Sequence, residues 1–151
     1  MEKLKDLLVC NSVRGVVRTS RDDIVEFHNP GVKDLFLLLE TRPKSLEGAC
    51  VADRVIGRGA ALLLVLGRVK KVYAKLISEP AIHVLQDAGI EFDYDQSVPN
   101  IINRDGTDMC PVEKLTTGIN DPEEAFEKIK EFLINNNYYE ILNSKCGFVS
   151  T

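Results

Sequence analysis

The sequence contains no tryptophan, only 2 histidines and only 4 cysteines in 151 residues. The cysteines (Cys10, Cys50, Cys110 and Cys146) lie far apart, and no two of them form a Cys-x-x-Cys pair. This spacing is typical of neither a disulfide-stapled secreted protein nor a zinc ribbon. The two histidines are too few for a chemistry that needs several of them. We therefore expect free thiols in a reducing cytoplasm.

The sequence also lacks an excess of positive charge and a long hydrophobic run. There are 19 basic and 23 acidic residues, which gives a net charge of -4, and the pI is near 5.2. Such a protein has no overall field that would hold nucleic acid or an anionic membrane. The longest apolar run, Ala60–Leu66, is far shorter than the roughly 20 residues of a membrane span. In the first eleven residues charges alternate with leucines, unlike in a signal peptide.

What is present is an ordinary globular composition, with 44% hydrophobic and 28% charged residues. This composition argues against disorder and against fibrous repeats. The length suits one domain and is too short for two good ones. We expect a single domain over residues 1–135, followed by a C-terminal tail over residues 136–151 in which no hydrophobic period is visible.

Hydrophobic periodicity predicts a mixed α/β fold. The expected helices cover residues 2–10, 33–40, 48–66, 80–88, 110–117 and 121–134, and the expected strands cover 12–19, 24–27, 69–77, 90–94 and 101–102. A hairpin comes first, and strands then alternate with helices. The predicted fold class is therefore α/β, with three α-β-α layers around a mixed sheet.

The helix expected over residues 48–66 is the most informative element. Its second half is apolar on every side, which is typical of a helix buried between layers. Its first half is rich in glycine and alanine, although each interior glycine costs about 1 kcal/mol relative to alanine. Close packing explains these small residues better than close approach of a ligand does. Because Gly57-x-Gly59 falls inside this helix, we do not expect a dinucleotide-binding fingerprint.

A basic and polar segment precedes the same expected helix. Arg42, Lys44 and Ser45 come just before Gly48. The free N–H groups and the positive dipole end of a helix N-terminus attract anions, above all phosphate. The segment therefore predicts an anion site, with an ordinary helix cap as the alternative.

Two cysteine–carboxylate pairs occur at expected helix starts. Cys50 and Asp53 are three residues apart, so on one helical turn both side chains would point into one pocket. A cysteine near a helix N-terminus can have a lowered pKa and act as a nucleophile or metal ligand. Cys110 and Glu113 repeat this spacing around a proline. The alternatives are a buried thiol beside a carboxylate paired with an arginine, and a simple capping arrangement.

Ser78 and Glu79 lie where an expected strand passes into an expected helix. Ligands of α/β sheets usually bind at the carboxyl ends of strands, so both residues are candidate pocket residues. His28 and His83 have no partner at a metal-binding spacing, and we interpret both as structural.

Three stretches of sequence carry a resemblance to a known family: SLEGACVADRVIGRGAALL, VYAKLISEPAIHVL and VPNIINRDGTDMCPVEKL. With them the chain resembles a small bacterial family of unknown function that has a cytidine-deaminase-like fold. The resemblance implies this fold, and it implies a pocket between two helix starts where relatives of the fold bind nucleosides and nucleotides.

Zinc deaminases of this superfamily carry a His-Ala-Glu or Cys-Ala-Glu motif at one helix start and Pro-Cys-x-x-Cys at the next. The resemblance puts the first motif at Cys50–Asp53, with an aspartate in place of the glutamate. It puts the second at Ser78–His83, where both cysteines are missing. Cys110 precedes its proline and has no second cysteine. We therefore expect neither bound zinc nor zinc-dependent deamination.

The predicted function is binding of a nucleotide or a related phosphorylated small molecule, without zinc-dependent deaminase activity. The predicted ligand-binding residues are Arg42, Lys44, Ser45, Cys50, Asp53, Ser78, Glu79, Cys110 and Glu113.

Several alternatives stay open. One is a transferase or hydrolase that uses Cys50 as nucleophile or Asp53 as general base. Others are a divergent nucleoside or nucleotide deaminase, a zinc site that survives at Cys50, His83 and Cys110, and a purely partner-binding role. The sequence leaves open whether a reaction is catalysed and whether the chain forms a homo-oligomer.

Overall fold

The computed structural model describes residues 1–10, 12–29, 31–103 and 106–136. It contains one five-stranded sheet with the strand order β2-β1-β3-β4-β5. The pairs β1–β2 and β1–β3 are antiparallel, whereas β3, β4 and β5 run parallel. The strands are β1 (Gly15–Arg18), β2 (Ile24–Phe27), β3 (Cys50–Ile56), β4 (Lys71–Ser78) and β5 (Glu91–Val98). The predicted mixed α/β sheet is confirmed.

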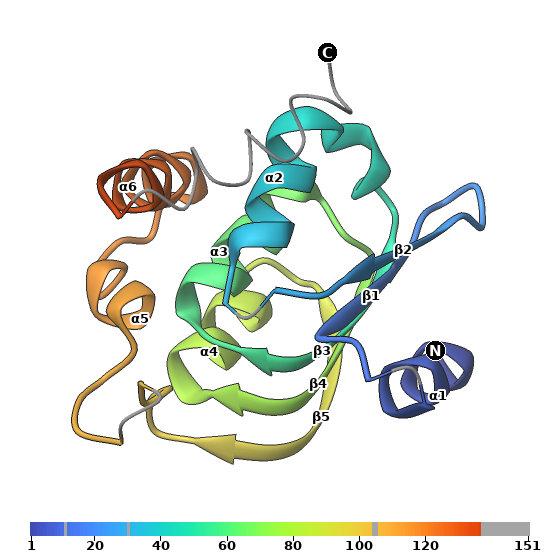
Figure 1. The fold of residues 1–151 in the computed structure, drawn as a ribbon, viewed down its shortest axis with the longest axis horizontal. Helices are drawn as coiled ribbons and strands as arrows, with labels where there is room; N and C mark the ends of the chain where they lie inside the picture. Colours follow the sequence, from blue (N-terminus) through green and yellow to red (C-terminus); the bar gives the residue numbers. More distant parts are fainter. Residues whose placement is uncertain (11, 30, 104–105, 137–151) are drawn as a thin grey trace.

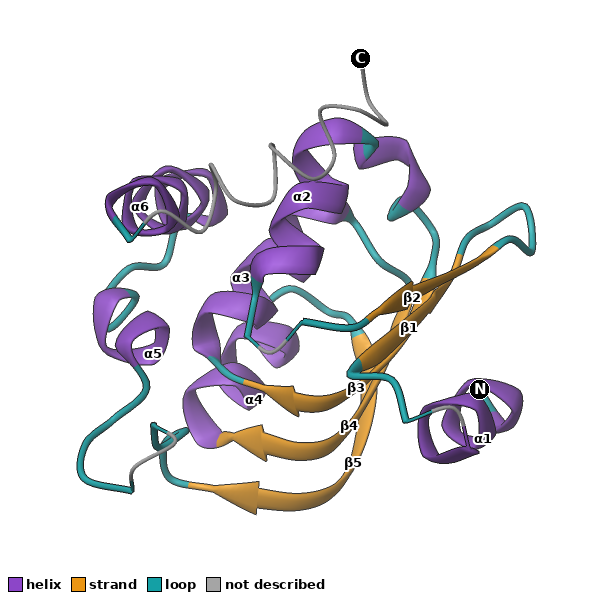
Figure 2. Cartoon of the chain, in the orientation of Figure 1, coloured by secondary structure: helices purple, strands orange, loops and turns teal. Residues whose placement is uncertain are grey.

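Helices cover both faces of this sheet (Figures 1 and 2). Helix α1 lies alone on one face, and α2, α3 and α4 cover the other. Helices α5 and α6 pack against α3 on the same side. The helices are α1 (Glu2–Cys10), α2 (Lys33–Thr41), α3 (Arg58–Gly67), α4 (Glu79–Asp87), α5 (Pro111–Leu115) and α6 (Pro122–Asn135). None of the helices in the described ranges is long and apolar enough to cross a membrane.

The starts of α4 and α6 follow from local sequence signals. The Ser78 hydroxyl accepts a hydrogen bond from the Ala81 N–H at 3.3 Å, and a proline follows in the first turn. The Asp121 carboxylate accepts one from the Glu123 N–H at 3.1 Å, again before a proline-initiated turn. A side-chain cap satisfies an N–H that has no partner inside the helix, and proline lacks the N–H that would otherwise be left unpaired. Both predicted helix starts are confirmed.

The prediction of one continuous helix over residues 48–66 is wrong in its first half. Residues Cys50–Ile56 form strand β3, and α3 begins only at Arg58. Strand β3 lies between β1 and β4 and is hydrogen-bonded on both edges, with partners that are distant in the sequence. A central strand of this kind lacks the polar–apolar alternation that identifies half-exposed strands. Gly57 therefore marks the junction between strand and helix, not the interior of a helix.

Helix α1 is fastened to its face of the sheet by a small second core. The Arg54 side chain, which comes from β3, donates to the Val13 carbonyl at 2.6 Å and to the Leu8 carbonyl at 2.8 Å. The second of these bonds gives a partner to the Leu8 carbonyl, which lies in the last turn of α1. The Lys5 ammonium lies 4.4 Å from the centre of the Tyr73 ring. The buried residues beneath α1 are Leu4, Leu8, Val13, Val16, Ala52 and Tyr73.

The larger core lies between the other face of the sheet and α2, α3, α4 and α6. Helix α6 packs on α2 through stacked rings of Phe36 and Phe126, whose centroids are 4.9 Å apart. At the start of α3, a Cβ on Gly59 would lie 2.4 Å from Val112 Cγ1 of α5. Close packing against helix α5 therefore explains why a glycine occupies position 59, as expected. Residues 137–151, in the expected tail, lie outside the described residues.

Replacing Gly59 with alanine tests this contact with an unambiguous sign. Helix propensity alone would stabilise Gly59→Ala by about 1 kcal/mol. The added methyl overlaps the β-branched side chain of Val112, which has little rotamer freedom. We expect a net loss of about 1–3 kcal/mol in the free energy of unfolding, measured by urea denaturation. Gly59→Ala combined with Val112→Ala should lose less than the two single variants together, and a stabilised Gly59→Ala would contradict the contact.

Candidate functional site

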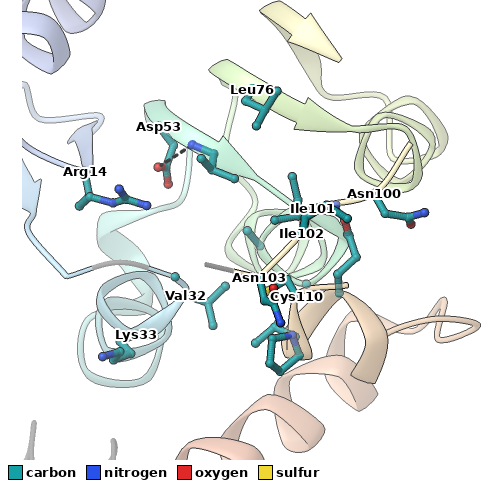
Figure 3. A pocket seen from close by; sticks show the side chains of 18 of the residues that line it. Arg14, Val32, Lys33, Asp53, Leu76, Asn100, Ile101, Ile102, Asn103 and Cys110 are labelled. Carbon is teal, nitrogen blue, oxygen red and sulfur yellow. Dashed lines mark hydrogen bonds between the residues drawn. The ribbon is translucent and has the colours of Figure 1, made fainter. Parts of the chain in front are cut away.

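A cavity of about 750 Å³ lies at the carboxyl ends of the parallel strands (Figure 3). Its walls come from the ends of β3, β4 and β5, the first turns of α2 and α3, the segment after β5, and parts of α5 and α6. Small-molecule sites have volumes of roughly 300–1,000 Å³. The cavity is therefore large enough for a ligand of nucleotide size.

Two charged side chains of the cavity, Arg14 and Asp53, are brought together by strand pairing. Asp53 lies in β3 directly opposite Gly15 of β1, and Arg14 is the residue before Gly15. Figure 3 shows the Arg14 guanidinium directed toward the Asp53 carboxyl group. A Cβ on Gly15 would lie 3.3 Å from Asp53 Cγ and 3.0 Å from Phe27 Cδ2. The glycine thus leaves room for the Asp53 side chain.

The Asp53 carboxyl group is tuned by its surroundings. Removal from bulk water raises the pKa of Asp53 from 3.8 to about 7. Backbone N–H groups of Val55 and Arg54 and the charge of Arg14 act in the opposite direction, and the charge of Asp34 adds to the rise. Asp53 therefore exchanges a proton near neutral pH. Carboxyl groups tuned in this way cluster at functional sites, where they serve as acids or bases.

Glu113 is the buried carboxylate at the back of the cavity, with only 3% of its surface exposed. Its Oε1 accepts from the Arg58 N–H at 2.6 Å and from the Ser78 hydroxyl at 3.1 Å, and its Oε2 accepts from the Ile101 N–H at 2.5 Å. A carboxylate is favoured at a helix N-terminus by the helix dipole. The anion position at the start of α3 is thus occupied by the protein's own side chain. A Cβ on Gly57 would lie 3.1 Å from Glu113 Oε1, so glycine permits this approach.

The segment between β5 and α5 closes one wall of the cavity. The Cys110 N–H donates to the Ile101 carbonyl at 2.7 Å, and the Asn103 N–H donates to the Asp108 carbonyl at 2.8 Å. Of the short strand expected at residues 101–102, only a single bridge between Ile102 and Met109 is present. This folded segment holds Ile101, Ile102 and Asn103 against the cavity.

The predicted ligand-binding residues divide into two groups. Asp53, Cys110 and Glu113 line the cavity, and Ser78 hydrogen-bonds to Glu113. The others lie outside the lining: Arg42, Lys44, Ser45, Cys50 and Glu79.

The anion site expected at Arg42, Lys44 and Ser45 rested on a helix that does not exist there. Residues Pro43–Ser45 form a short 3-10 helix, and the next regular element is strand β3. Arg42 and Lys44 are exposed. They lie near the amino end of β3, whereas the cavity is at its carboxyl end.

Cys50 and Asp53 do not share a pocket, because side chains of a strand alternate between its two faces. Asp53 faces the cavity, whereas Cys50 packs with the core beneath α1 and accepts a hydrogen bond from Arg18 at 3.7 Å. The three cysteines within the described ranges are free thiols, and Cys146 lies outside those ranges. Glu79 is exposed in the first turn of α4.

The alternative zinc site is not assembled. Among the described residues, no three histidine, cysteine, aspartate or glutamate side chains come close enough to hold a metal ion. Cys50, His83 and Cys110 therefore do not meet. Of Gly57-x-Gly59, which was expected inside a helix, Gly57 lies at the junction of β3 and α3 and Gly59 lies in the first turn of α3. The two glycines make room for Glu113 and Val112.

The cavity is also lined by four residues that no sequence pattern predicted: Arg14, Lys33, Asn100 and Asn103. One signal could have indicated Arg14, because glycine inside a strand often marks a close approach, and Gly15 follows it directly. The two asparagines lie in a segment rich in turn-forming residues just after a strand, which is where α/β proteins carry ligand-binding groups. Lys33 has no distinctive local pattern.

Replacing Asp53 with asparagine should stabilise the protein in a pH-dependent way. Because the folded-state pKa is raised to about 7 from 3.8, burial of Asp53 costs nothing below pH 4 and destabilises increasingly between pH 4 and pH 7. We expect Asp53→Asn to equal the wild type at pH 4 and to be more stable at pH 8 by up to about 4 kcal/mol, because one pKa unit corresponds to about 1.4 kcal/mol. Urea denaturation at both pH values measures this. The exposed control Asp87→Asn should show no such trend, and equal stabilities of Asp53→Asn and wild type at pH 8 would refute the raised pKa.

Comparison with known proteins places this architecture in a family. No curated protein is significantly similar to the chain. The crystal structure of a DUF1893 family protein from Thermotoga maritima matches with a TM-score of 0.79 and 28% sequence identity, covering 86% of this chain and 87% of that one. The family model described as a domain of unknown function, DUF1893, matches residues 4–133. This agrees with the expected membership of a family of unknown function, and because the match spans most of the chain, the protein belongs to the DUF1893 family.

Proposed function

We propose that the cavity binds a small molecule in which a phosphate or similar anionic group is joined to a flat, largely apolar part, as in a nucleotide, without zinc-dependent deamination. The observation that carries this proposal is the Arg14 guanidinium directed into a cavity of about 750 Å³. We place this activity in the cytoplasm, where the free thiols stay reduced.

The anionic part of the ligand would bind near Arg14. Within the described ranges, no hydrogen bond or salt bridge engages its guanidinium, which leaves the donors for a ligand. Arginine presents a planar set of N–H groups that matches phosphate oxygens in pairs. Lys33, in the first turn of α2, also lines the cavity.

The flat part of the ligand would lie against the apolar wall. Val55, Leu76 and Ile101 line the cavity together with Phe132 and Leu133 of α6. The Asn100 side chain borders the same space, and its amide offers both a donor and an acceptor to the edge of a base. The Asn103 amide also borders it but holds its own turn, because its Oδ1 accepts from the Thr107 N–H at 3.1 Å. Apolar walls with a few polar groups are typical of small-molecule sites.

The resemblance to the cytidine-deaminase-like family supports a nucleotide as the ligand. Relatives of that fold bind nucleosides and nucleotides between two helix starts. The resemblance puts that pocket between the helix starts near Cys50 and Ser78. In this chain the cavity reaches the start of α3, where Gly57, Gly59 and Ala60 line it, and Ser78 at the start of α4 hydrogen-bonds to the lining residue Glu113. We assign the cytidine-deaminase-like fold as part of the same proposal.

Arg14→Gln is the variant that tests the proposed anion site. Loss of a charge-assisted contact should weaken binding of a nucleoside 5′-monophosphate by about 10- to 100-fold. Isothermal titration calorimetry with the 5′-monophosphates of adenosine, guanosine, cytidine and uridine measures the affinity, and the parent nucleosides show what the phosphate contributes.

Arg42→Gln is the matched control, because Arg42 is exposed near the opposite end of β3. It should bind these monophosphates within twofold of the wild type. A loss of affinity in Arg42→Gln with none in Arg14→Gln would restore the anion site expected from the sequence. No binding of any monophosphate at millimolar concentration would refute the proposed function.

A second candidate function is acid–base catalysis of a transfer or hydrolysis reaction by Asp53. The observation that favours it is the pKa of Asp53, raised to about 7 within the ligand cavity. General acids and bases work best when their pKa is near the operating pH. Cys50, the other candidate nucleophile, lies outside the cavity lining.

Asp53→Asn separates binding from catalysis. If Asp53 acts as acid or base, the variant should retain nucleotide binding at pH 6 but lose phosphate or base release by about 100-fold or more. Chromatography of the nucleotide panel after incubation with each protein measures the release. Turnover that survives in Asp53→Asn would eliminate this role, and Asp87→Asn serves as the control.

A further inference from the structure

We propose that Asp53 couples ligand binding to proton uptake: it accepts a proton and donates it in a hydrogen bond to the anionic group that Arg14 binds. This inference rests on the proposed function and concerns the regulation of the same site. It makes Asp53 a specificity-determining residue, because a ligand without an anionic group at this position would not require the proton.

The geometry places the two side chains on either side of the same space. Asp53 belongs to β3 and pairs with Gly15 of β1, Arg14 is the residue just before Gly15, and both charged residues line one cavity. In the described part of the chain, no salt bridge joins the two. The Asp53 Oδ1 accepts one long hydrogen bond, from the Val55 N–H at 3.4 Å. A ligand oxygen bound between these groups would contact both the guanidinium and the carboxyl group.

An ionised Asp53 in this space would repel an anionic ligand and weaken its binding. Two negative charges a few ångströms apart repel strongly where water is largely excluded. A proton on Asp53 removes the repulsion and turns an acceptor into a hydrogen-bond donor. One proton enters from solvent to form the Asp53 O–H bond, and no covalent bond of the ligand changes.

The other charged or titratable groups around Asp53 do not take over this role. Lys33 from α2 carries a positive charge and favours the anion. The Asp34 carboxylate accepts from the His28 and Asn29 N–H groups at 2.7 and 2.8 Å, in the turn before α2.

On α5, Glu113 is committed to the N–H groups of Arg58 and Ile101 and to Ser78. Cys110 also lines the cavity, and its N–H donates to the Ile101 carbonyl at 2.7 Å. Among the described lining carboxyl groups, Asp53 is the one that lies beside Arg14, and its hydrogen bond from the Val55 N–H is long.

The energetic cost of the proton is small near neutral pH. Burial raises the pKa of Asp53 to about 7. A group with this pKa is about nine-tenths protonated at pH 6 and about one-tenth protonated at pH 8. If only the protonated form accepts the anion, affinity falls about tenfold between these pH values.

Isothermal titration calorimetry tests the coupling with 3′,5′-cyclic nucleotides, whose phosphodiester keeps one negative charge over this range. Paired titrations in two buffers of different ionisation enthalpy count the protons taken up. We expect about 0.9 proton per ligand at pH 8 and about 0.1 at pH 6, with a Kd about tenfold weaker at pH 8. The variant Asp53→Asn keeps a hydrogen-bond donor but cannot ionise. Its Kd should therefore change less than twofold between pH 6 and pH 8, and its proton uptake should vanish.

Asp87→Asn, an exposed carboxylate on α4, is the control and should keep the full pH dependence. Binding without proton uptake, or uptake that persists in Asp53→Asn, overturns the coupling and leaves the proposed function intact. If only 5′-monophosphates bind, the uptake measured in Asp53→Asn is subtracted to remove the ionisation of the phosphate itself. Failure of cyclic and 5′-monophosphates alike to bind the wild type overturns both the coupling and the proposed function.

Discussion

The carboxylate of Glu113 connects three segments that meet at the carboxyl end of the parallel strands. It accepts hydrogen bonds from the first turn of α3, from Ser78 at the end of β4, and from the Ile101 N–H after β5. Burying a charged group is costly unless donors surround it. Here the donors come from segments far apart in the sequence, so the carboxylate fixes their relative positions. The walls of the cavity are built on this junction.

Close approach at this end of the sheet depends on glycine. Gly57 admits the Glu113 carboxylate, Gly59 admits Val112 of α5, and Gly15 admits the Asp53 side chain. At each of these positions the backbone of one segment is approached closely by a side chain from another. The small residues thus serve packing, and the packing in turn shapes the space available to a ligand.

Two carboxyl groups of the cavity, Glu113 and Asp53, differ in their surroundings. Glu113 has three strong donors and holds the fold together. Asp53 has one long hydrogen bond and faces the open cavity beside Arg14. The first is fixed by its partners, whereas the second remains responsive to pH and to whatever enters the cavity. Glu113 thus belongs to the frame of the cavity, and Asp53 is the carboxyl group positioned to contact a bound ligand.

Local patterns were sufficient for much of the fold. The periodic leucines of α1, the hairpin of β1 and β2, and the capping signals at Ser78 and Asp121 all depend on residues a few positions apart. Cys110 and Glu113 were recognised from sequence as pocket residues, and both line the cavity. Asp53 was recognised too, but through a mistaken helix.

The sequence by itself determined most of the helices, the N-terminal hairpin, the mixed α/β class and the likeness to a family of unknown function. Only the tertiary structure decided that residues 50–56 form a strand, because their hydrogen-bond partners come from β1 and β4. That decision moves Cys50 away from Asp53, since strands alternate faces where a helix would bring both to one side. It also brings Arg14 next to Asp53, through pairing between residues nearly forty positions apart. A contact of that kind arises from the register of the sheet, which no local pattern specifies.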